Sequence, residues 1–440
     1  MNADNDIHAT PPAPFPAGPV IDRATLEGWT QWRLTRRDFV PAARITLGEY
    51  NKMSPRQRWI HDLHRMATHS NLPIQETPMS AAVSDVLRRR IQCNAVKGTE
   101  RTRPGLMVNG GGFQGKTETV CETAADFEDN WLAAHASLNP DAVPGTRDLV
   151  APVAYVQTPV TAKPISTCQA ILDFYGEDYK NMRLGELTRT VRRALKEHAT
   201  KVLVLDDITR LKMHREADQD VLDFIRDLMN ITVAILVGVG IPKSGLLREG
   251  RQDPQTGEWV FPPVRDKGKS PNDDAATQTE RRFKLVNLDP FRYDTPEDIA
   301  AWLKHLSGIQ TQLRLFRAEE DMLTGGTMPE YLFRRTGGIV GLLGCLIEEA
   351  CMAAIDTGKE RLTPELLDEV DIDLSNIPNR DPRPGSSPTC RHSQPSRSRP
   401  RGTEAATPCS TTGALAPQRR ADRPAHGSSS SATQSGFATR

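Results

Sequence analysis

The sequence lacks long apolar runs, paired cysteine motifs and an excess of charge of either sign. No stretch approaches the roughly eighteen consecutive apolar residues that a membrane-spanning helix needs, and the polar start at 1–4 is unlike a secretory signal. We therefore expect a cytoplasmic protein with no membrane segment. The 56 Lys and Arg residues balance 56 Asp and Glu residues, so only a local surface could bind a polyanion.

The seven cysteines are odd in number and scattered along the chain. None lies in a CxxC motif, and none has a histidine at a spacing typical of metal ligands. We interpret them as reduced thiols, several of them in the core, because disulfides are rare in the cytosol. The cysteines therefore give little support to a zinc site.

The stretch from Gly105 to Val120, GLMVNGGGFQGKTETV, carries the clearest chemical signal. Residues 110–117 fit the pattern G-x-x-x-x-G-K-[ST]. In such a loop, successive backbone N–H groups surround a phosphate, the lysine reaches the β- and γ-phosphates, and the threonine hydroxyl can bind Mg²⁺. The residues that we predict to bind ATP are Gly110, Gly111, Gly112, Phe113, Gln114, Gly115, Lys116, Thr117 and Glu118.

The alternative interpretation of this stretch is an accidental glycine-rich turn. Its surroundings argue against that interpretation, because a short apolar strand at 106–108 precedes the loop. After it, apolar residues recur at helical spacing, at Val120, Ala124, Phe127, Trp131 and Ala134. A strand, a loop and then a helix N-terminus that favours anions is the context that phosphate binding requires.

A second candidate site lies at Val202-Leu203-Val204-Leu205-Asp206-Asp207. Four apolar residues ending in acid predict a buried strand that delivers a carboxylate to the carboxyl edge of a sheet. We predict that Asp206 holds Mg²⁺ and that Asp207 orients or deprotonates the attacking water. A single acid at a strand end is more typical of a cap or turn. A pair about ninety residues after a phosphate loop favours catalysis.

From Gly105 onward, predicted strands alternate with helices, which is typical of an α/β fold with a parallel sheet covered on both faces. We expect the strands at 106–108, 151–156, 201–206, 233–237 and 284–286. The regions that we expect are a disordered leader (1–20), an N-terminal helical region (21–75), an α/β nucleotide-binding domain (76–293) with a polar insert at about 248–279, a helical lid (294–375) and a disordered basic tail rich in Pro, Ser and Arg (376–440).

Taken together, these motifs resemble those of an AAA+ P-loop ATPase. The resemblance adds Arg281-Arg282-Phe283 after the fourth strand and Thr336-Gly337-Gly338 before the lid helix. Within AAA+ proteins, the sequence is most similar to bacterial transposition helper ATPases of the TniB/TnsC type, relatives of IstB. The likeness covers about residues 45–375 and includes the segments 155–163 and 207–212.

The resemblance implies an ATP- and Mg²⁺-dependent ATPase that forms homo-oligomeric rings or filaments on duplex DNA without regard to sequence. It implies recruitment of a DDE-type transposase, a role in target selection, and a bacterial cytoplasmic location, associated with the nucleoid when on DNA. It places on Arg281 or Arg282 the arginine that reaches a neighbour's γ-phosphate. The residues that match DNA contacts are Lys163, Lys180 and Arg183, for which ordinary solvated surface is the alternative.

Three positions depart from the AAA+ pattern. Asp207 stands where most members carry Glu, and Gly238-Val239-Gly240 stands where Asn, Thr or Ser would sense the γ-phosphate. The lid helix lacks the arginine that many members place near Gly341, although Arg335 lies just before it. These departures suggest slow hydrolysis, with bound ATP acting as an assembly switch.

Several alternatives stay open from the sequence. The chain could be another AAA+ ATPase, such as a helicase loader or replication-initiator relative, or a signalling NTPase that never touches DNA. The cluster of Arg33, Arg36 and Arg37 predicts either a basic arm or, more simply, a solvated surface run. The transposase, the target site, the oligomer size and the roles of the insert and tail do not follow from the sequence.

Overall fold

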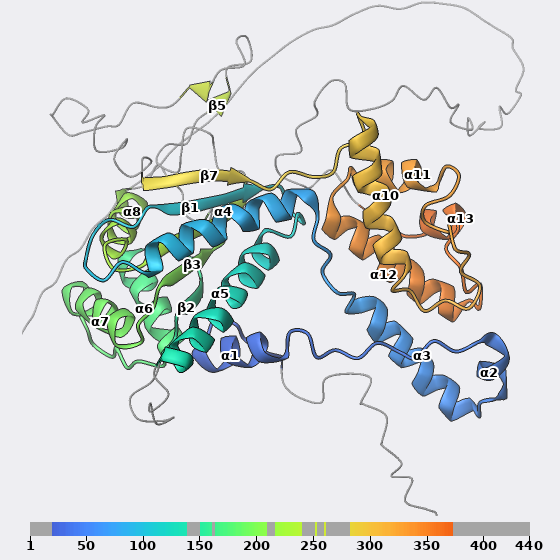
Figure 1. Cartoon of the computed structure of the whole chain (residues 1–440), viewed down its shortest axis with the longest axis horizontal. Coiled ribbons are helices and arrows are strands. Elements are labelled where there is room, and N and C mark those ends of the chain that lie inside the picture. The colour runs from blue at the N-terminus through green and yellow to red at the C-terminus, as the bar shows by residue number, and fades with distance from the viewer. Residues whose placement is uncertain are drawn as a thin grey trace, which may run out of the picture. The chain divides into compact units, whose positions relative to one another are not determined.

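The computed structural model describes residues 20–138, 150–160, 163–208, 216–239, 251–252, 259–260 and 282–372 (Figure 1). The predicted leader (apart from Val20) and the basic tail lie outside these ranges, as do Arg281 and Gly240. Of the predicted polar insert, the described part is the antiparallel pair β5 (Arg251–Gln252) and β6 (Trp259–Val260).

A five-stranded parallel sheet forms the centre of the α/β part, in the order β2-β3-β4-β1-β7. The strands are β1 (Gly105–Gly110), β2 (Val153–Gln157), β3 (Val202–Asp206), β4 (Val233–Val239) and β7 (Phe283–Asn287). Every residue of β3 is buried, which agrees with its continuous apolar run, because strands of a parallel sheet are covered on both faces. The predicted α/β class and parallel sheet are confirmed.

The helices of the described residues that accompany this sheet are α4 (Pro78–Ala95), α5 (Lys116–Leu138), α6 (Pro164–Tyr175), α7 (Leu184–Glu197) and α8 (Glu216–Leu228). Helix α4 contacts β1 and α5, whereas α6 contacts β2 and α7. Thr77 caps α4 by accepting the N–H of Ser80, and Pro78 occupies the first helical position, where its missing N–H costs nothing. The apolar faces of these helices and of the sheet share one buried core.

The lid has its own apolar core, built from α10 (Pro296–Gln310), α11 (Met328–Thr336), α12 (Val340–Asp356) and α13 (Pro364–Asp368) (Figure 1). The apolar stripe read from the sequence of α12 is buried throughout: Ile339, Leu342, Leu343, Leu346, Ile347, Ala350 and Cys351. Among the described helices, none alone has the length and apolarity to cross a membrane. By length and composition, α11 and α12 meet that test only as a pair, with a 114° bend between them.

The N-terminal helices are α1 (Leu26–Thr35), α2 (Leu47–Lys52) and α3 (Pro55–Ser70). Helix α1 contacts α5 of the α/β part, whereas α3 contacts α12 of the lid. Trp29 of α1 is fully buried, and its indole N–H donates to Glu128 Oε2 of α5 at 2.7 Å. Arg65 of α3 is also buried and donates to both carboxylate oxygens of Glu360, at 2.7 and 3.1 Å. The segment between α1 and α3 therefore joins the helix that follows the phosphate loop to the lid.

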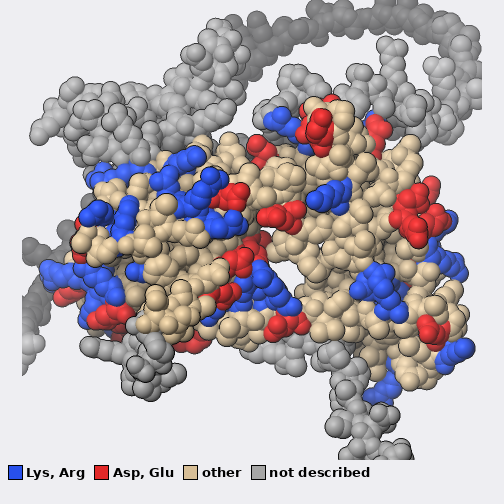
Figure 2. Space-filling view, in the orientation of Figure 1, with Lys and Arg blue, Asp and Glu red and all other residues tan. Residues whose placement is uncertain are grey.

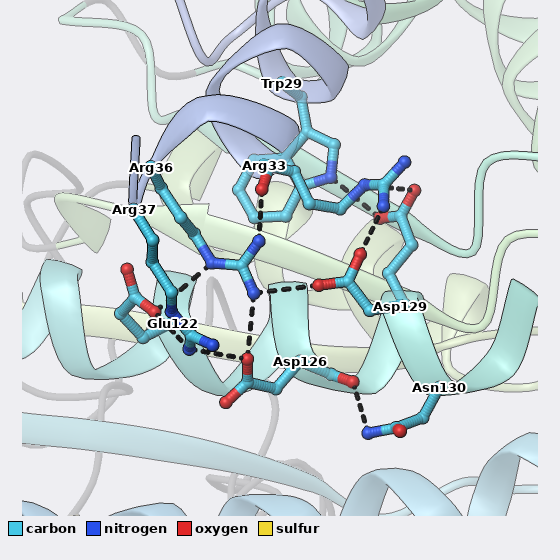
Figure 3. Close-up of polar contacts among 9 residues, drawn as sticks. Trp29, Arg33, Arg36, Arg37, Glu122, Asp126, Asp129 and Asn130 are labelled. Carbon is cyan, nitrogen blue, oxygen red and sulfur yellow. Dashed lines mark hydrogen bonds and ion pairs between the residues drawn. The ribbon is translucent and has the colours of Figure 1, made fainter. Parts of the chain in front are cut away.

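The cluster of Arg33, Arg36 and Arg37 faces acidic residues of α5 (Figure 3). Arg36 donates to Asp126 and Asp129 at 2.9 and 2.8 Å, and its side chain is only 7% exposed. The other ion pairs of the cluster join Arg36 to Glu122, Arg33 to Glu128 and Asp129, and Arg37 to Glu122 and Asp126. Both interpretations of the cluster, a free basic arm and a solvated run, are wrong for Arg33 and Arg36, because these guanidinium groups hold α1 against α5.

The contact between α3 and the lid predicts a loss of stability in acid. The ring of His69 is buried, and its Nε2 accepts the backbone N–H of Arg314 at 2.9 Å, which requires an unprotonated nitrogen. Burial, together with the nearby cations Arg65 and Arg314, lowers the pKa of His69 to about 4. In the unfolded chain this histidine takes up a proton below about pH 6.5. The stability that it contributes is therefore complete above that pH and is lost as the pH falls towards 4.

When the pH falls from 7.5 to 5, the free energy of unfolding should decrease less in His69→Gln than in the wild type. The two decreases should differ by up to roughly 2 kcal/mol. Urea denaturation of both proteins at the two pH values measures this difference. Other titrating groups, such as His305, are common to both proteins and cancel in the comparison. Equal losses in the two proteins would contradict the assignment.

Candidate nucleotide-binding site

The predicted phosphate loop lies between the end of β1 at Gly110 and the start of α5 at Lys116. Gly115 has φ +76°, a left-handed conformation that glycine adopts without strain. Phe113, with φ +59°, adopts the same region at a cost on the order of 1–3 kcal/mol, and the residue is 60% exposed. The loop thus leads into the N-terminus of the 23-residue helix α5, where free N–H groups favour an anion.

Lys116 supplies a buried positive charge at this loop. It is 8% exposed, and its Nζ donates to the carbonyl of Gly111 at 2.6 Å. No carboxylate forms a salt bridge with it among the described residues. Burial lowers the pKa of Lys116, whereas the charges of Asp206 and Asp207 oppose that shift. A buried ammonium that lacks an ion pair is costly unless an anion neutralises it, and a phosphate group would do so.

Thr117 and Asp206 meet beside the lysine. The Thr117 hydroxyl donates to Asp206 Oδ2 at 2.8 Å, and the N–H of Asp207 donates to Oδ1 at 2.8 Å. Asp206 is 4% exposed, so its charge is held away from water. Sequence reasoning placed these two oxygen donors in one magnesium site, and the sheet order brings them together from β3 and from the start of α5.

The donor set fits Mg²⁺, which prefers oxygen ligands and usually keeps several waters and phosphate oxygens. A hydroxyl and one carboxylate suit such a partly solvated ion. Among the described residues, no cluster of three or more His, Cys, Asp or Glu side chains could hold a metal on its own. A magnesium ion at this site would therefore depend on the nucleotide for part of its coordination.

Residues 106–242 match the family model of the AAA domain. This range contains the phosphate loop, the Asp206–Asp207 pair, strands β2 to β4 and all of β1 except Gly105. This part of the chain has the AAA+ P-loop ATPase fold. Proteins with this domain are in general nucleotide-hydrolysing ATPases. The match, the sheet order and the phosphate loop thus confirm the AAA+ part of the resemblance.

Similar solved structures include two archaeal proteins and one nematode protein. Aeropyrum pernix ORC2, solved with ADPNP and ADP, has a TM-score of 0.43 and 12% identity, over 67% of this chain and 68% of that chain. A. pernix ORC1, solved with DNA, has a TM-score of 0.45 and 15% identity, over 68% and 66%. C. elegans PCH-2 has a TM-score of 0.30 and 11% identity, over 67% and 68%. No curated protein matches the sequence.

The lid touches the phosphate loop of the AAA+ domain directly. The N–H of Gly341, in the first turn of α12, donates to the carbonyl of Phe113 at 2.8 Å. A Cβ at position 341 would lie 2.5 Å from that carbonyl, so only glycine permits this approach. An arginine at position 341 would therefore displace the lid from the loop. Arg335 does not replace the missing arginine, because its guanidinium donates within the lid to the carbonyls of Leu367 and Val370.

Glu118 contributes differently from the other predicted nucleotide-binding residues. Its carboxylate accepts two hydrogen bonds from the guanidinium of Arg23, at 2.9 and 3.1 Å. The side chain is therefore engaged by the N-terminal segment. The group of Glu118 that could contact a phosphate is its backbone N–H.

The structure describes two of the three predicted catalytic residues, Asp207 and Arg282. Asp207 has φ +53° and is half-buried directly after the buried carboxylate. Arg282 donates to the carbonyl of Arg226, near the end of α8, at 3.2 Å. Because Arg281 lies outside the described residues, the reach of this arginine pair to a neighbour's nucleotide stays a prediction.

The predicted DNA contacts are exposed on the segment from β2 to α7. Lys163 is the N-cap of α6, Arg183 is the N-cap of α7, and Lys180 lies between these helices. None of the three side chains forms a salt bridge within the described ranges, which suits either phosphate contacts or solvated surface. On the face drawn in Figure 2, basic and acidic side chains are interspersed, and the described residues form no continuous basic surface there.

Sequence reasoning gave Tyr155 of β2 no chemical role. Its hydroxyl donates to Asp206 Oδ2 at 2.8 Å, the same oxygen that Thr117 contacts. The signal that could have found it is a tyrosine within an otherwise aliphatic buried strand, because a buried phenol needs a hydrogen-bond partner. The identity of the partner depends on the register of β2 and β3, which the sequence does not state.

The buried ammonium makes a direct prediction about nucleotide affinity. Lys116→Ala removes a charge-assisted contact to the phosphates, so we expect ATP affinity to fall at least about tenfold while folding is retained. Calorimetric titration with Mg·ATP measures the effect. Lys201→Ala is the matched control, since Lys201 is also partly buried but lies over the ring of Trp131. Unchanged ATP affinity in Lys116→Ala would refute the assignment.

Proposed function

We propose that this protein is an ATP-dependent AAA+ ATPase that assembles as a homo-oligomer on duplex DNA and regulates DNA transposition. One observation supports the nucleotide-dependent part above all others. The buried Lys116 ammonium, without a salt bridge among the described residues, lies next to the Thr117–Asp206 oxygen pair. This combination of a cation and two hard oxygen donors suits a magnesium-bound nucleotide phosphate.

In this proposal the residues of the loop bind and orient the nucleotide. The N–H groups at the start of α5 and the Lys116 ammonium hold the phosphate oxygens. A bound Mg²⁺ would be held by Thr117 and Asp206 and would neutralise phosphate charge. Asp207 orients the attacking water, and because its side chain is one methylene shorter than Glu, we expect slow turnover. Slow hydrolysis fits a protein in which bound ATP controls assembly.

Resemblance supports the DNA and transposition parts of the proposal. It covers about residues 45–375 and includes the segments 155–163 and 207–212. The residues that match the DNA contacts of the transposition helpers are Lys163 and those around Lys180 and Arg183, between the second and third strands. A DDE-type transposase is the partner that this likeness implies. The exposed side chains of Lys163, Lys180 and Arg183 are compatible with phosphate contacts, because no described carboxylate occupies them.

Oligomerisation supplies the affinity that a single chain would lack. Each protomer would contribute two or three phosphate contacts, too few for tight binding by a monomer. Several protomers linked along one duplex multiply these contacts through effective concentration. DNA binding should therefore require ATP, show no sequence preference, and weaken steeply with salt as more phosphates are neutralised.

Lys163→Glu tests this DNA surface. We expect it to abolish ATP-dependent binding to a nonspecific duplex and to leave ATP affinity intact, because a like charge is introduced next to phosphate. Gel shifts with and without ATP over a salt series give both affinity and salt slope. Lys304→Glu, at an exposed position on α10, is the control and should bind DNA as the wild type does.

Two outcomes would count against the DNA surface. If Lys163→Glu shifts DNA with an unchanged salt slope, Lys163 is only solvated surface. If the wild type binds ATP but never shifts duplex DNA, a signalling NTPase describes the protein better. Both results are separable from a failure of nucleotide binding, which calorimetry reports independently.

A further inference from the structure

The carboxylate of Asp206 is held on both of its oxygens. Oδ1 accepts the N–H of Asp207 at 2.8 Å, and Oδ2 accepts the hydroxyls of Thr117 and Tyr155, each at 2.8 Å. Thr117 is itself a candidate magnesium ligand. Tyr155 is therefore the side chain that holds this carboxylate without belonging to the predicted nucleotide-binding loop.

We infer that Tyr155 is a positioning residue, which orients the Asp206 carboxylate towards a magnesium ion bound with the nucleotide. The inference rests on the proposed function, because it assumes that the end of β3 forms part of a nucleotide site. It goes further by assigning a role to the hydroxyl of Tyr155 in β2. Groups that hydrogen-bond a metal's carboxylate ligand fix its orientation and strengthen metal binding.

The register of the sheet explains why this tyrosine reaches this aspartate. Tyr155 pairs with Val204 in the parallel ladder of β2 and β3. Because alternate residues of a strand share a face, Val204 and Asp206 lie on the same side of the sheet as Tyr155. The diagonal neighbour of Tyr155 across the strands is then Asp206, within reach of a long aromatic side chain.

The N-terminal segment holds the ring of Tyr155 in place. Trp29 stacks against it, with ring centroids 6.1 Å apart and an interplanar angle of 12°. Arg23 lies 5.6 Å from the ring centroid and also binds Glu118, directly after Thr117.

The simpler alternative is that Tyr155 is a core tyrosine whose hydroxyl happens to find a partner. Tyr175 of α6 shows what such a residue looks like. It is buried, and its hydroxyl hydrogen-bonds Thr200 Oγ1 at 2.6 Å, with no contact to Asp206. A pair of Tyr→Phe substitutions at these two positions therefore separates loss of a buried hydrogen bond from loss of the Asp206 contact.

The experiment measures ATP affinity by calorimetry in EDTA and over a series of magnesium concentrations. It compares the wild type with Tyr155→Phe and Tyr175→Phe. Each variant lacks only the phenol oxygen and keeps the ring. We expect the two variants to retain wild-type ATP affinity in EDTA. We expect the magnesium concentration that half-saturates the affinity gain to rise about tenfold in Tyr155→Phe alone.

Three other outcomes would overturn the inference. Wild-type magnesium dependence in Tyr155→Phe would show that the hydroxyl only satisfies the core. An equal change in Tyr175→Phe would show that general destabilisation is the cause, and unfolding temperatures of the variants would show it as well. Failure of the wild type to bind ATP under any condition would overturn the proposed function, and the role of Tyr155 with it.

Discussion

The hydrogen bond between Thr117 and Asp206 joins the two chain segments on which the candidate site depends. One segment is the phosphate loop with the start of α5, and the other is the end of β3. Their meeting requires the sheet order β3-β4-β1, in which two buried strands deliver their carboxyl ends to one edge. The same arrangement leaves Lys116 buried beside the two oxygen donors. The pair of oxygen donors for a metal ion and the buried ammonium that needs an anion thus both result from this meeting of two chain segments.

Three further contacts reach this juxtaposition from different parts of the chain. Arg23 binds Glu118 from the N-terminal segment, Tyr155 holds Asp206 from β2, and Gly341 of the lid donates to the loop at Phe113. The N-terminal segment also holds the lid through α3. A movement of the phosphate loop would therefore be transmitted to the lid both directly and through the N-terminal helices. The proposed ATP-controlled assembly switch requires such coupling.

The features that the sequence predicted correctly are local ones. The strands, the loop and the apolar stripe of α12 follow from the spacing of apolar residues over short stretches of sequence. That spacing predicts which side chains are buried. The contacts that it missed join residues far apart in the chain. The acidic partners of Arg33 and Arg36 lie about 90 residues away on α5, so the cluster looked solvated. The contacts of Tyr155 and Gly341 depend likewise on register and on the close approach of the lid.

The most direct test of the central claim is cryo-electron microscopy of the protein with Mg·ATP and a nonspecific duplex. The account predicts a ring or filament around the DNA, with nucleotide phosphates at residues 110–117, magnesium between Thr117 and Asp206, and Arg281 or Arg282 of a neighbouring protomer near the γ-phosphate. Single chains with an empty phosphate loop, or a nucleotide bound elsewhere in the fold, would contradict it.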